Sequence, residues 1–156
     1  MDMTITIRQA TPDEVEQLVP LLLQAEHSEG ALRWGFANLV DAIYRMDDGT
    51  ALVGAATMQW RNEACEIMEL AIAPERHRQG LGRQFVNWLV DEARRRGKHA
   101  LLVGTANSSI GNIAFYQKSG LRMDTVRRDY FRYYHEPVYE DGIQIRDMLV
   151  FRLTLH

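Results

Sequence analysis

The sequence predicts an α/β (α+β) fold in which one mixed sheet carries helices on its faces. Segments with the two-residue period of strands alternate with segments of helical period along the whole chain. The chain has 156 residues, the length of one ordinary domain. Hydrophobic residues make up 46% and charged residues 25%, both average for a globular protein. Since no repeat, low-complexity tract or linker interrupts the sequence, residues 1–156 are predicted to form a single domain.

The N-terminal part predicts a strand followed by a helix. The alternation Thr-Ile-Thr-Ile-Arg indicates a short strand at residues 4–8. Thr11 and Glu14 have the spacing of a capping box, and apolar residues at helical spacing carry the predicted helix to about Glu26. Residues 27–37 are ambiguous, and a loop with a short helix is expected there.

The next part predicts three strands. Residues 39–45 and 52–60 have strand-like composition and are joined through Asp48 and Gly49. An Asp-Gly pair favours a hairpin because both turn positions prefer a positive φ. A further strand is predicted at residues 64–72, where the chain reaches an Ala-Pro pair.

The second half predicts two helices and three strands. An amphipathic pattern with one broad apolar arc indicates a helix that lies on a sheet, and a nearly continuous apolar run indicates a strand covered on both faces. The predicted elements are a helix at 80–95 stopped by Gly97, a strand at 99–105, a helix at 109–119, and strands at 121–126 and 145–155. The last two strands are separated by an aromatic-rich segment at 130–139.

The charge balance excludes several classes of partner. Lys plus Arg number 18 and Asp plus Glu number 21, so the formal net charge is −3. Because proteins that bind duplex nucleic acid usually carry a basic excess, no nucleic-acid partner is expected. No apolar run approaches the roughly 18 residues that span a bilayer, and the N-terminal segment lacks the charge and apolar core of a signal peptide. The sequence therefore predicts a cytoplasmic protein with no membrane partner.

Cysteine and histidine give no sign of a metal site. Cys65 is the one cysteine, so no internal disulfide can form. The five histidines have no zinc-ligand spacing, and no metal is expected.

The segment at residues 69–83 carries the clearest chemical signal. A strand runs into a polar loop with Gly80 and Gly82 and then directly into an amphipathic helix. Consecutive backbone N–H groups and the positive end of the helix dipole would form an anion site suited to phosphate. A dinucleotide fingerprint would need a third glycine, and a P-loop would need Gly-Lys-Ser/Thr. The remaining alternative is that the two glycines only fit the helix tightly to the sheet.

Two motifs resemble the GNAT superfamily of N-acetyltransferases. Residues 79–82 (Gln-Gly-Leu-Gly), soon after Ile-Ala-Pro, resemble the family's acetyl-CoA pyrophosphate loop, although His77 stands where Arg or Gln is usual. Residues 115–121 (Phe-Tyr-Gln-Lys-Ser-Gly-Leu) resemble a second family motif, with leucine in place of its final phenylalanine. Residues 104–109 and 141–148 resemble the YvbK-like branch of bacterial acetyltransferases. The resemblance covers residues 4–155.

The resemblance implies a fold, a reaction and a co-substrate. The fold would have a mostly antiparallel sheet of about seven strands with about four helices. The reaction would be direct transfer of an acetyl group from acetyl-CoA to a primary amine in a ternary complex. The partner would be a small-molecule amine or a peptide N-terminus, and the protein would be a monomer or a homodimer. The alternatives are a protein N-terminal acetyltransferase of the ribosomal-protein alanine type and a non-catalytic acyl-CoA-binding module.

The resemblance also implies catalytic roles. Tyr116 matches the family's general-acid tyrosine, which would protonate the departing thiolate; packing of its ring is the alternative. Glu66 stands where some members carry a catalytic glutamate and is favoured as the base, although other members use a water chain. Glu69 follows three residues later, and regular strand alternation would place the two carboxylates on opposite faces. At position 104, where other relatives carry the base, this chain has Gly104.

The same resemblance implies which residues bind the cofactor. The end of the strand at 64–72 would contact the acetyl and pantetheine groups, and the following loop would hold the pyrophosphate. The predicted cofactor-binding residues are Leu70, Ala71, Ile72, His77, Arg78, Gln79, Gly80, Leu81, Gly82, Arg83, Asn107, Asn112, Tyr116 and Lys118. Helix capping is the alternative role for Asn107, and a solvated position is the alternative for Lys118.

Two variable segments would border the acceptor in the family's fold. Here they are residues 26–29 with Trp34, and residues 130–136 with 139–141, which are rich in acids and aromatic residues. Acids attract an ammonium group, and aromatic faces add a cation–π attraction of roughly 0.5–2 kcal/mol. A cationic amine is therefore predicted; the alternative is that the tyrosines anchor a loop and the acids are solvated. The predicted substrate-binding residues are Glu29, Trp34, Tyr130, Tyr133 and Glu136.

Overall fold

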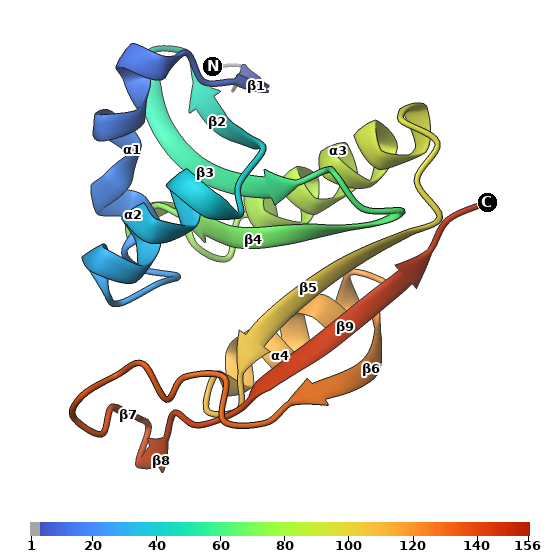
Figure 1. The fold of residues 1–156 in the computed structure, drawn as a ribbon. Coiled ribbons are helices and arrows are strands. Elements are labelled where there is room, and N and C mark those ends of the chain that lie inside the picture. The colour runs from blue at the N-terminus through green and yellow to red at the C-terminus, as the bar shows by residue number, and fades with distance from the viewer. Residues whose placement is uncertain (1–3) are drawn as a thin grey trace.

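The computed structural model describes residues 4–156. Residues 1–3, part of the segment considered above for a signal peptide, lie outside the described part. The main sheet has seven strands in the order β1-β2-β3-β4-β5-β9-β6 (Figure 1). Its strands are β1 (Ile5–Gln9), β2 (Ala42–Asp48), β3 (Ala51–Gln59), β4 (Ala64–Ile72), β5 (Ala100–Ala106), β6 (Arg122–Arg127) and β9 (Met148–Thr154). Only the β4–β5 pair within this sheet is parallel. The predicted fold class is confirmed.

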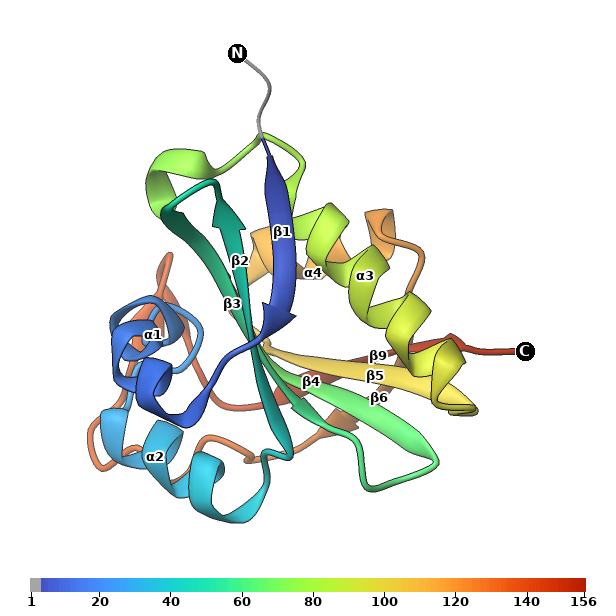
Figure 2. The same cartoon turned by 90° about the horizontal axis from the view of Figure 1, so that it is seen from above.

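Helices cover both faces of the sheet. They are α1 (Val15–Leu22), α2 (Glu29–Asn38), α3 (Leu81–Arg95) and α4 (Ile110–Lys118), with 3₁₀ turns η1 (Pro12–Glu14) and η2 (Pro74–Arg76). Figure 2 shows α1 and α2 on one side of the sheet and α3 and α4 on the other. Each side has its own apolar core: α3 buries Phe85 and Leu89 against one face, and α1 buries Leu18 and Leu22 against the other. No helix among residues 4–156 is long and apolar enough to span a membrane.

β4 and β5 separate along their length. Residues 64–67 of β4 pair with residues 100–103 of β5, and the pairing stops there. Beyond this point the two strands diverge, which opens the middle of the sheet (Figure 1). Residues from the C-terminal halves of both strands line a cavity at this point.

A bulge in β4 changes which face its acids occupy. Thr57 of β3 pairs with Glu69 and Met58 pairs with Ile67, so Met68 is an extra residue in β4. An extra residue shifts the alternation of side chains by one position. Glu66 and Glu69 consequently line the same cavity. The prediction that strand alternation places them on opposite faces was wrong because it assumed a regular strand.

Two predicted segments differ in detail. The ambiguous stretch at 27–37 is α2, which begins after Ser28; its side-chain oxygen accepts a hydrogen bond from the N–H of Ala31 at 3.1 Å. The helix predicted to reach Glu26 ends at Leu22. The predicted β2–β3 hairpin is present, but Asp48 pairs with Ala51, so its turn comes one residue later than the Asp-Gly pair.

An Asp-Gly turn of the predicted kind occurs elsewhere. Asp141 and Gly142 have φ values of 52° and 79° and join β7 (Tyr139–Glu140) to β8 (Ile143–Gln144). This small hairpin lies in the connection from β6 to β9, so the last strand starts at Met148 rather than at residue 145. Figure 1 shows the hairpin at the end of the molecule toward which β4 and β5 diverge. The aromatic-rich connection thus reaches the opening in the sheet.

Candidate active site

Two adjoining cavities occupy the opening between β4 and β5. One, of about 570 Å³, lies between the end of β4, the η2–α3 loop and α4, and is named here the loop cavity. The other, of about 110 Å³, is lined by four glutamates and is named the acidic cavity. Leu70, Asn112 and Tyr116 line both cavities, and so do two residues that follow α1. The opening therefore leads from one side of the sheet to the other.

The loop cavity is lined by most of the predicted cofactor-binding residues. They are Leu70, Ala71, Ile72, His77, Arg78, Gly80, Leu81, Gly82, Arg83, Asn112, Tyr116 and Lys118. Two predicted residues are not among its lining. The side-chain oxygen of Gln79 accepts a hydrogen bond from Arg76 at 2.8 Å. The side chain of Asn107 accepts from the backbone N–H groups of Arg146 and Asp147 at 2.9 and 3.0 Å and so ties β5 to the segment before β9.

The conformation of the η2–α3 loop suits an anion. Gly80 caps α3 with a φ of 79°, in the left-handed region that glycine adopts without strain. The first turn of a helix leaves its N–H groups without intrahelical acceptors, and the helix dipole adds positive potential there. Nε2 of His77 lies 2.8 Å from the carbonyl oxygen of Ile72, which fixes the loop to the end of β4. This start of α3 borders the loop cavity.

The two glycines of this loop have different roles. A Cβ at Gly80 would meet no atom within 4 Å, so the requirement there is the backbone angle and the open space. A Cβ at Gly82 would lie 3.1 Å from the ring of Phe115 on α4. Gly82 therefore lets α3 approach α4 closely, whereas the sequence left open a packing role against the sheet. Gly80 serves the loop.

Glu69 lies partly buried in the acidic cavity. Burial raises the pKa of its carboxyl group to about 7, although a hydrogen bond from the Thr57 hydroxyl acts in the opposite direction. The nearby charges of Glu26 and Glu66 raise this pKa further. A carboxyl group with a pKa near 7 can accept and release a proton at neutral pH.

Glu66 is held in an ion pair. Its two carboxylate oxygens accept hydrogen bonds from Nη2 and Nη1 of Arg127 at 2.8 and 3.0 Å. The Glu66 side chain is only 10% exposed. Proton transfer at this carboxylate would have to compete with the bidentate pairing, so of the two acids on β4, Glu69 is the one whose surroundings suit a base.

Tyr116 sits at the junction of the two cavities. Its ring packs against Phe115 and Phe151, with ring centroids 5.1 and 6.0 Å away. Burial raises the pKa of its hydroxyl group, so the phenol stays protonated at neutral pH. A protonated hydroxyl group between the two cavities can donate a proton to a leaving group.

The outer wall of the acidic cavity is built from the two variable segments. Glu26 accepts hydrogen bonds from the hydroxyl groups of Tyr133 and Tyr134 at 2.7 and 2.9 Å, which joins the α1–α2 connection to the β6–β7 connection. Glu140 accepts from the hydroxyl groups of Ser108 and Ser109 at 2.9 and 2.7 Å. The acids and rings of this wall are Glu26, Glu140, Tyr130, Phe131 and Tyr134.

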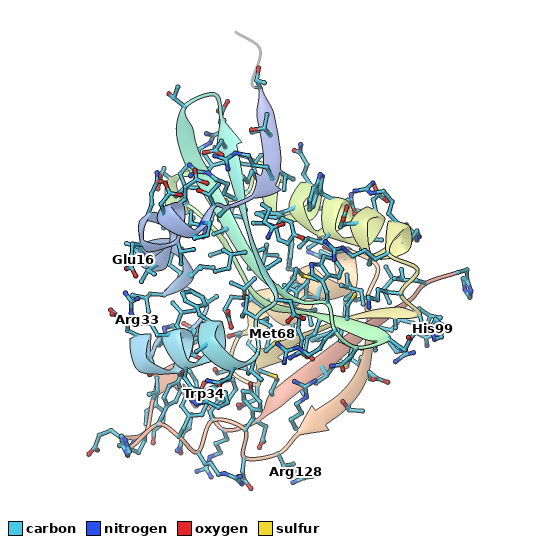
Figure 3. The ribbon with its side chains drawn as sticks, turned by 45° about the horizontal axis from the view of Figure 1, so that its top comes forward. Glu16, Arg33, Trp34, Met68, His99 and Arg128 are labelled. Atoms are coloured by element: carbon cyan, nitrogen blue, oxygen red, sulfur yellow. The ribbon has the colours of Figure 1, made fainter. Side chains whose placement is uncertain are left out.

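Of the five predicted substrate-binding residues, Tyr130 lines the acidic cavity. Glu29 pairs with Arg33 on α2, Trp34 is 60% exposed on the same helix (Figure 3), and Glu136 lines a separate pocket. Tyr133 does not line the acidic cavity, and its hydroxyl group donates a hydrogen bond to Glu26, which does. The sequence identified the two segments but did not predict that Glu26 and Glu140 are the acids within them that reach the cavity. The Asp-Gly turn after Glu140 was the signal that could have placed that residue.

Comparison with known proteins gives consistent matches. Residues 8–121 match the Acetyltransferase (GNAT) family. The uncharacterized N-acetyltransferase YvbK of Bacillus subtilis (strain 168) is 35% identical over 109 residues, 69% of this chain and 70% of that protein. The ribosomal protein bS18-alanine N-acetyltransferase of Escherichia coli (strain K12) is 35% identical over 65 residues, 42% of this chain and 44% of that protein. A GNAT family acetyltransferase from Elizabethkingia anophelis with acetyl-CoA bound has a TM-score of 0.85 and 28% identity, covering 97% of this chain and 98% of its own.

Proposed function

The chain belongs to the Acetyltransferase (GNAT) family, and from that premise we propose that it transfers the acetyl group of acetyl-CoA to a cationic primary amine held in the acidic cavity. The observation that carries this proposal is the joining of the two cavities at Tyr116, in a cavity that the carboxyl group of Glu69 also lines. A thioester entering from the loop cavity and an amine entering from the acidic cavity would meet there.

The loop cavity fits acetyl-CoA. The backbone N–H groups at the start of α3 would bind the pyrophosphate, an arrangement supported by the left-handed Gly80 and the open space around it. Arg78 and Lys118 line the same cavity and add positive charge. Asn112 lies where the pantetheine arm would pass between β4 and β5. Acetyl-CoA supplies the activated acyl group, a thioester.

Glu69 is proposed as the general base. An amine acceptor arrives mostly as an ammonium ion and must lose a proton before its nitrogen can attack. The partly buried carboxylate of Glu69, with a pKa of about 7, can take that proton at neutral pH. As the pH falls below 7 the carboxyl group becomes protonated, so kcat/KM is expected to fall on the acidic side.

Tyr116 is proposed as the general acid. The amine nitrogen forms a bond to the acetyl carbon while the bond from that carbon to sulfur breaks. Glu69 has released the ammonium proton to solvent by then, so it takes the second proton of the amine nitrogen, and the departing thiolate takes the phenolic proton of Tyr116. The proton on Glu69 then returns through solvent to the phenolate, which leaves both residues as they began. Because burial keeps this phenol protonated, the proton is present when the thiolate forms.

The acidic cavity supports a cationic acceptor. Within the described residues, no lysine or arginine lines it, whereas Glu26, Glu69 and Glu140 do. The ring of Tyr130 and its two aromatic neighbours would add cation–π attraction. A carboxylate that already accepts hydrogen bonds from serine or tyrosine hydroxyl groups has lone pairs left for an ammonium group.

The proposal is tested by incubating the purified protein with acetyl-CoA and panels of amines, and by following the release of free thiol. The panels are polyamines, aminoglycosides, amino acids and short peptides. Cationic amines are expected to give the largest kcat/KM, and Glu69→Gln is expected to lose most of the turnover. Neutral or anionic amines that outperform the cationic ones would overturn the acceptor class.

A second candidate is acetylation of a peptide N-terminus. The 65-residue similarity to the Escherichia coli ribosomal protein bS18-alanine N-acetyltransferase favours it. Gly104 leaves β5 without the glutamate expected as base in that reaction, and a Cβ there would lie 2.2 Å from the sulfur of Met148. Peptides with an N-terminal alanine in the panel test this second candidate. Their N-acetylated forms, which lack a free amine, are the control.

A further inference from the structure

The ion pair between Glu66 and Arg127 spans three strand-to-strand steps of the sheet. Glu66 is on β4 and Arg127 ends β6, with β5 and β9 between them. Two hydrogen bonds at 2.8 and 3.0 Å join the guanidinium to both carboxylate oxygens. Their side chains are 10% and 35% exposed. A bidentate pair of this kind fixes orientation as well as charge.

The guanidinium of Arg127 also contacts Met148. Nη1 of Arg127 lies 3.6 Å from the sulfur of Met148. That sulfur occupies the space that a side chain at position 104 would fill, because a Cβ on Gly104 would lie 2.2 Å from it. Because Gly104 has no side chain, Met148 has room at this position. There its sulfur contacts the guanidinium of Arg127, which pairs with Glu66.

The pair also controls charge next to Glu69. The bulge at Met68 places Glu66 and Glu69 on the same face, in one cavity. Two carboxylates that share a site disfavour each other's ionised form. The other titratable groups lining this cavity are Glu26 and His27 from the α1–α2 connection, Tyr116 from α4, Tyr130 and Tyr134 from the β6–β7 connection, and Glu140 from β7. None of these groups is a permanent cation, so the guanidinium of Arg127 is the positive charge that compensates Glu66.

We infer that Arg127 is a positioning residue for the acetyl transfer: by binding Glu66 it offsets part of the charge of that carboxylate, which shares a cavity with Glu69, and so favours the proton-accepting form of Glu69. This inference rests on the proposed role of Glu69 as the base. Arg127 itself does not line the acidic cavity, so it acts through Glu66 and contacts neither reactant.

The experiment is a set of pH profiles of kcat/KM for the best amine of the panel. The acidic limb of such a profile is the pH range in which kcat/KM falls as the pH is lowered. In Arg127→Gln the unpaired carboxylate of Glu66 should move this limb to higher pH by about one unit. In Glu66→Gln the unpaired guanidinium should move it to lower pH. In the double variant both charges are absent, and the limb should return to within about 0.3 unit of the wild-type position, a reversal that a purely structural role would not produce.

Two further variants separate charge from geometry and location. Arg127→Lys keeps the cation but loses the bidentate contact, so its limb should stay near that of the wild type. Arg128→Gln removes the same charge from the adjacent residue, which is exposed and lies at the edge of the molecule (Figure 3). Its limb should not move.

The outcomes distinguish this inference from the proposed function. If Glu69→Gln keeps an acidic limb near pH 7, Glu69 is not the base and the proposed mechanism fails. If Glu69→Gln abolishes the limb but folded Arg127→Gln leaves it in place, the role of Arg127 is refuted while the mechanism stands. Should Arg127→Gln not fold, the downward shift in Glu66→Gln decides, and its absence would equally overturn the inference.

Discussion

The loop cavity and the acidic cavity are built in different ways. The loop cavity takes most of its lining from two continuous stretches, residues 70–83 and 111–119. The acidic cavity draws its acids from β4, the α1–α2 connection and β7, and most of its aromatic rings from the β6–β7 connection. One binding surface is local in sequence and the other is assembled by the tertiary fold.

The two cavities also differ in the groups they offer. The start of α3 would bind its ligand through backbone N–H groups, which every residue except proline provides. The one sequence requirement is then a glycine at the left-handed position of the loop. The acidic cavity presents particular carboxylates and rings such as Glu140 and Tyr130. Substitutions can therefore affect the acceptor without the cofactor, and the following variants test how separable the two sides are.

The largest effect is expected where the cavities meet. Tyr116→Phe keeps the buried ring and loses only the hydroxyl group, so the fold should persist. General acid catalysis contributes about 10²–10⁴-fold, and kcat should fall within that range. KM for acetyl-CoA should change little, because the ring still lines the loop cavity. Turnover within about twofold of the wild type would exclude Tyr116 as the acid.

A smaller effect, confined to the cofactor, is expected at Gly80. A left-handed conformation costs an ordinary residue about 1–2 kcal/mol, and a β-branched side chain also blocks the ligand. Gly80→Val should weaken CoA binding about 10- to 100-fold in a calorimetric titration. Gly97→Val is the matched control, since Gly97 has a φ of 70° at the other end of α3. It should lower the melting temperature and leave CoA affinity unchanged; equal losses in both variants would contradict the loop assignment.

The family resemblance predicted most of the residues that line the loop cavity, and the larger part of them form one contiguous segment. The lining residues that it missed are Gln24, Ala25, Arg76, Gly111, Phe115 and Ser119. A strand, a glycine-containing loop and an amphipathic helix follow one another, and backbone geometry alone then places the residues. Gln79 is the exception within the loop: its side chain turns to Arg76 instead of the cavity. Its orientation depends on a side-chain contact that the motif does not encode.

The acidic cavity could not be predicted at the same detail. The bulge at Met68 depends on how β3 and β4 pair, and it reverses the expected relation between Glu66 and Glu69. The reach of Glu140 depends on the small hairpin at Asp141 and its hydrogen bonds to two serines of β5's outgoing loop. Composition indicated acids and aromatic residues near the acceptor, and only tertiary structure selects which of them face it.

Removing one acid of the outer wall should affect the acceptor alone. Glu140→Gln keeps an oxygen for the hydroxyl groups of Ser108 and Ser109, so the wall should keep its shape. Hydrogen bonds to charged groups contribute roughly 1.5–3 kcal/mol, and partial solvation reduces this value, so KM for the amine should rise about tenfold. KM for acetyl-CoA should stay the same, and added salt should raise the amine's KM in the wild type more than in the variant. A parallel rise in both KM values would mean that the two cavities are not separable.

The smallest effect is expected at acids of the same segments that face away from the cavity. Glu29 pairs with Arg33 on the surface of α2, in a network that includes Glu16 of α1 (Figure 3). Glu136 is exposed and lines a separate pocket. Both Glu29→Gln and Glu136→Gln remove one negative charge, as Glu140→Gln does, but screening by solvent and salt weakens exposed charges beyond about 8–10 Å. The amine's KM should therefore change by less than about twofold in either variant. A tenfold rise in Glu136→Gln would show that the β6–β7 connection adopts another arrangement when the amine binds.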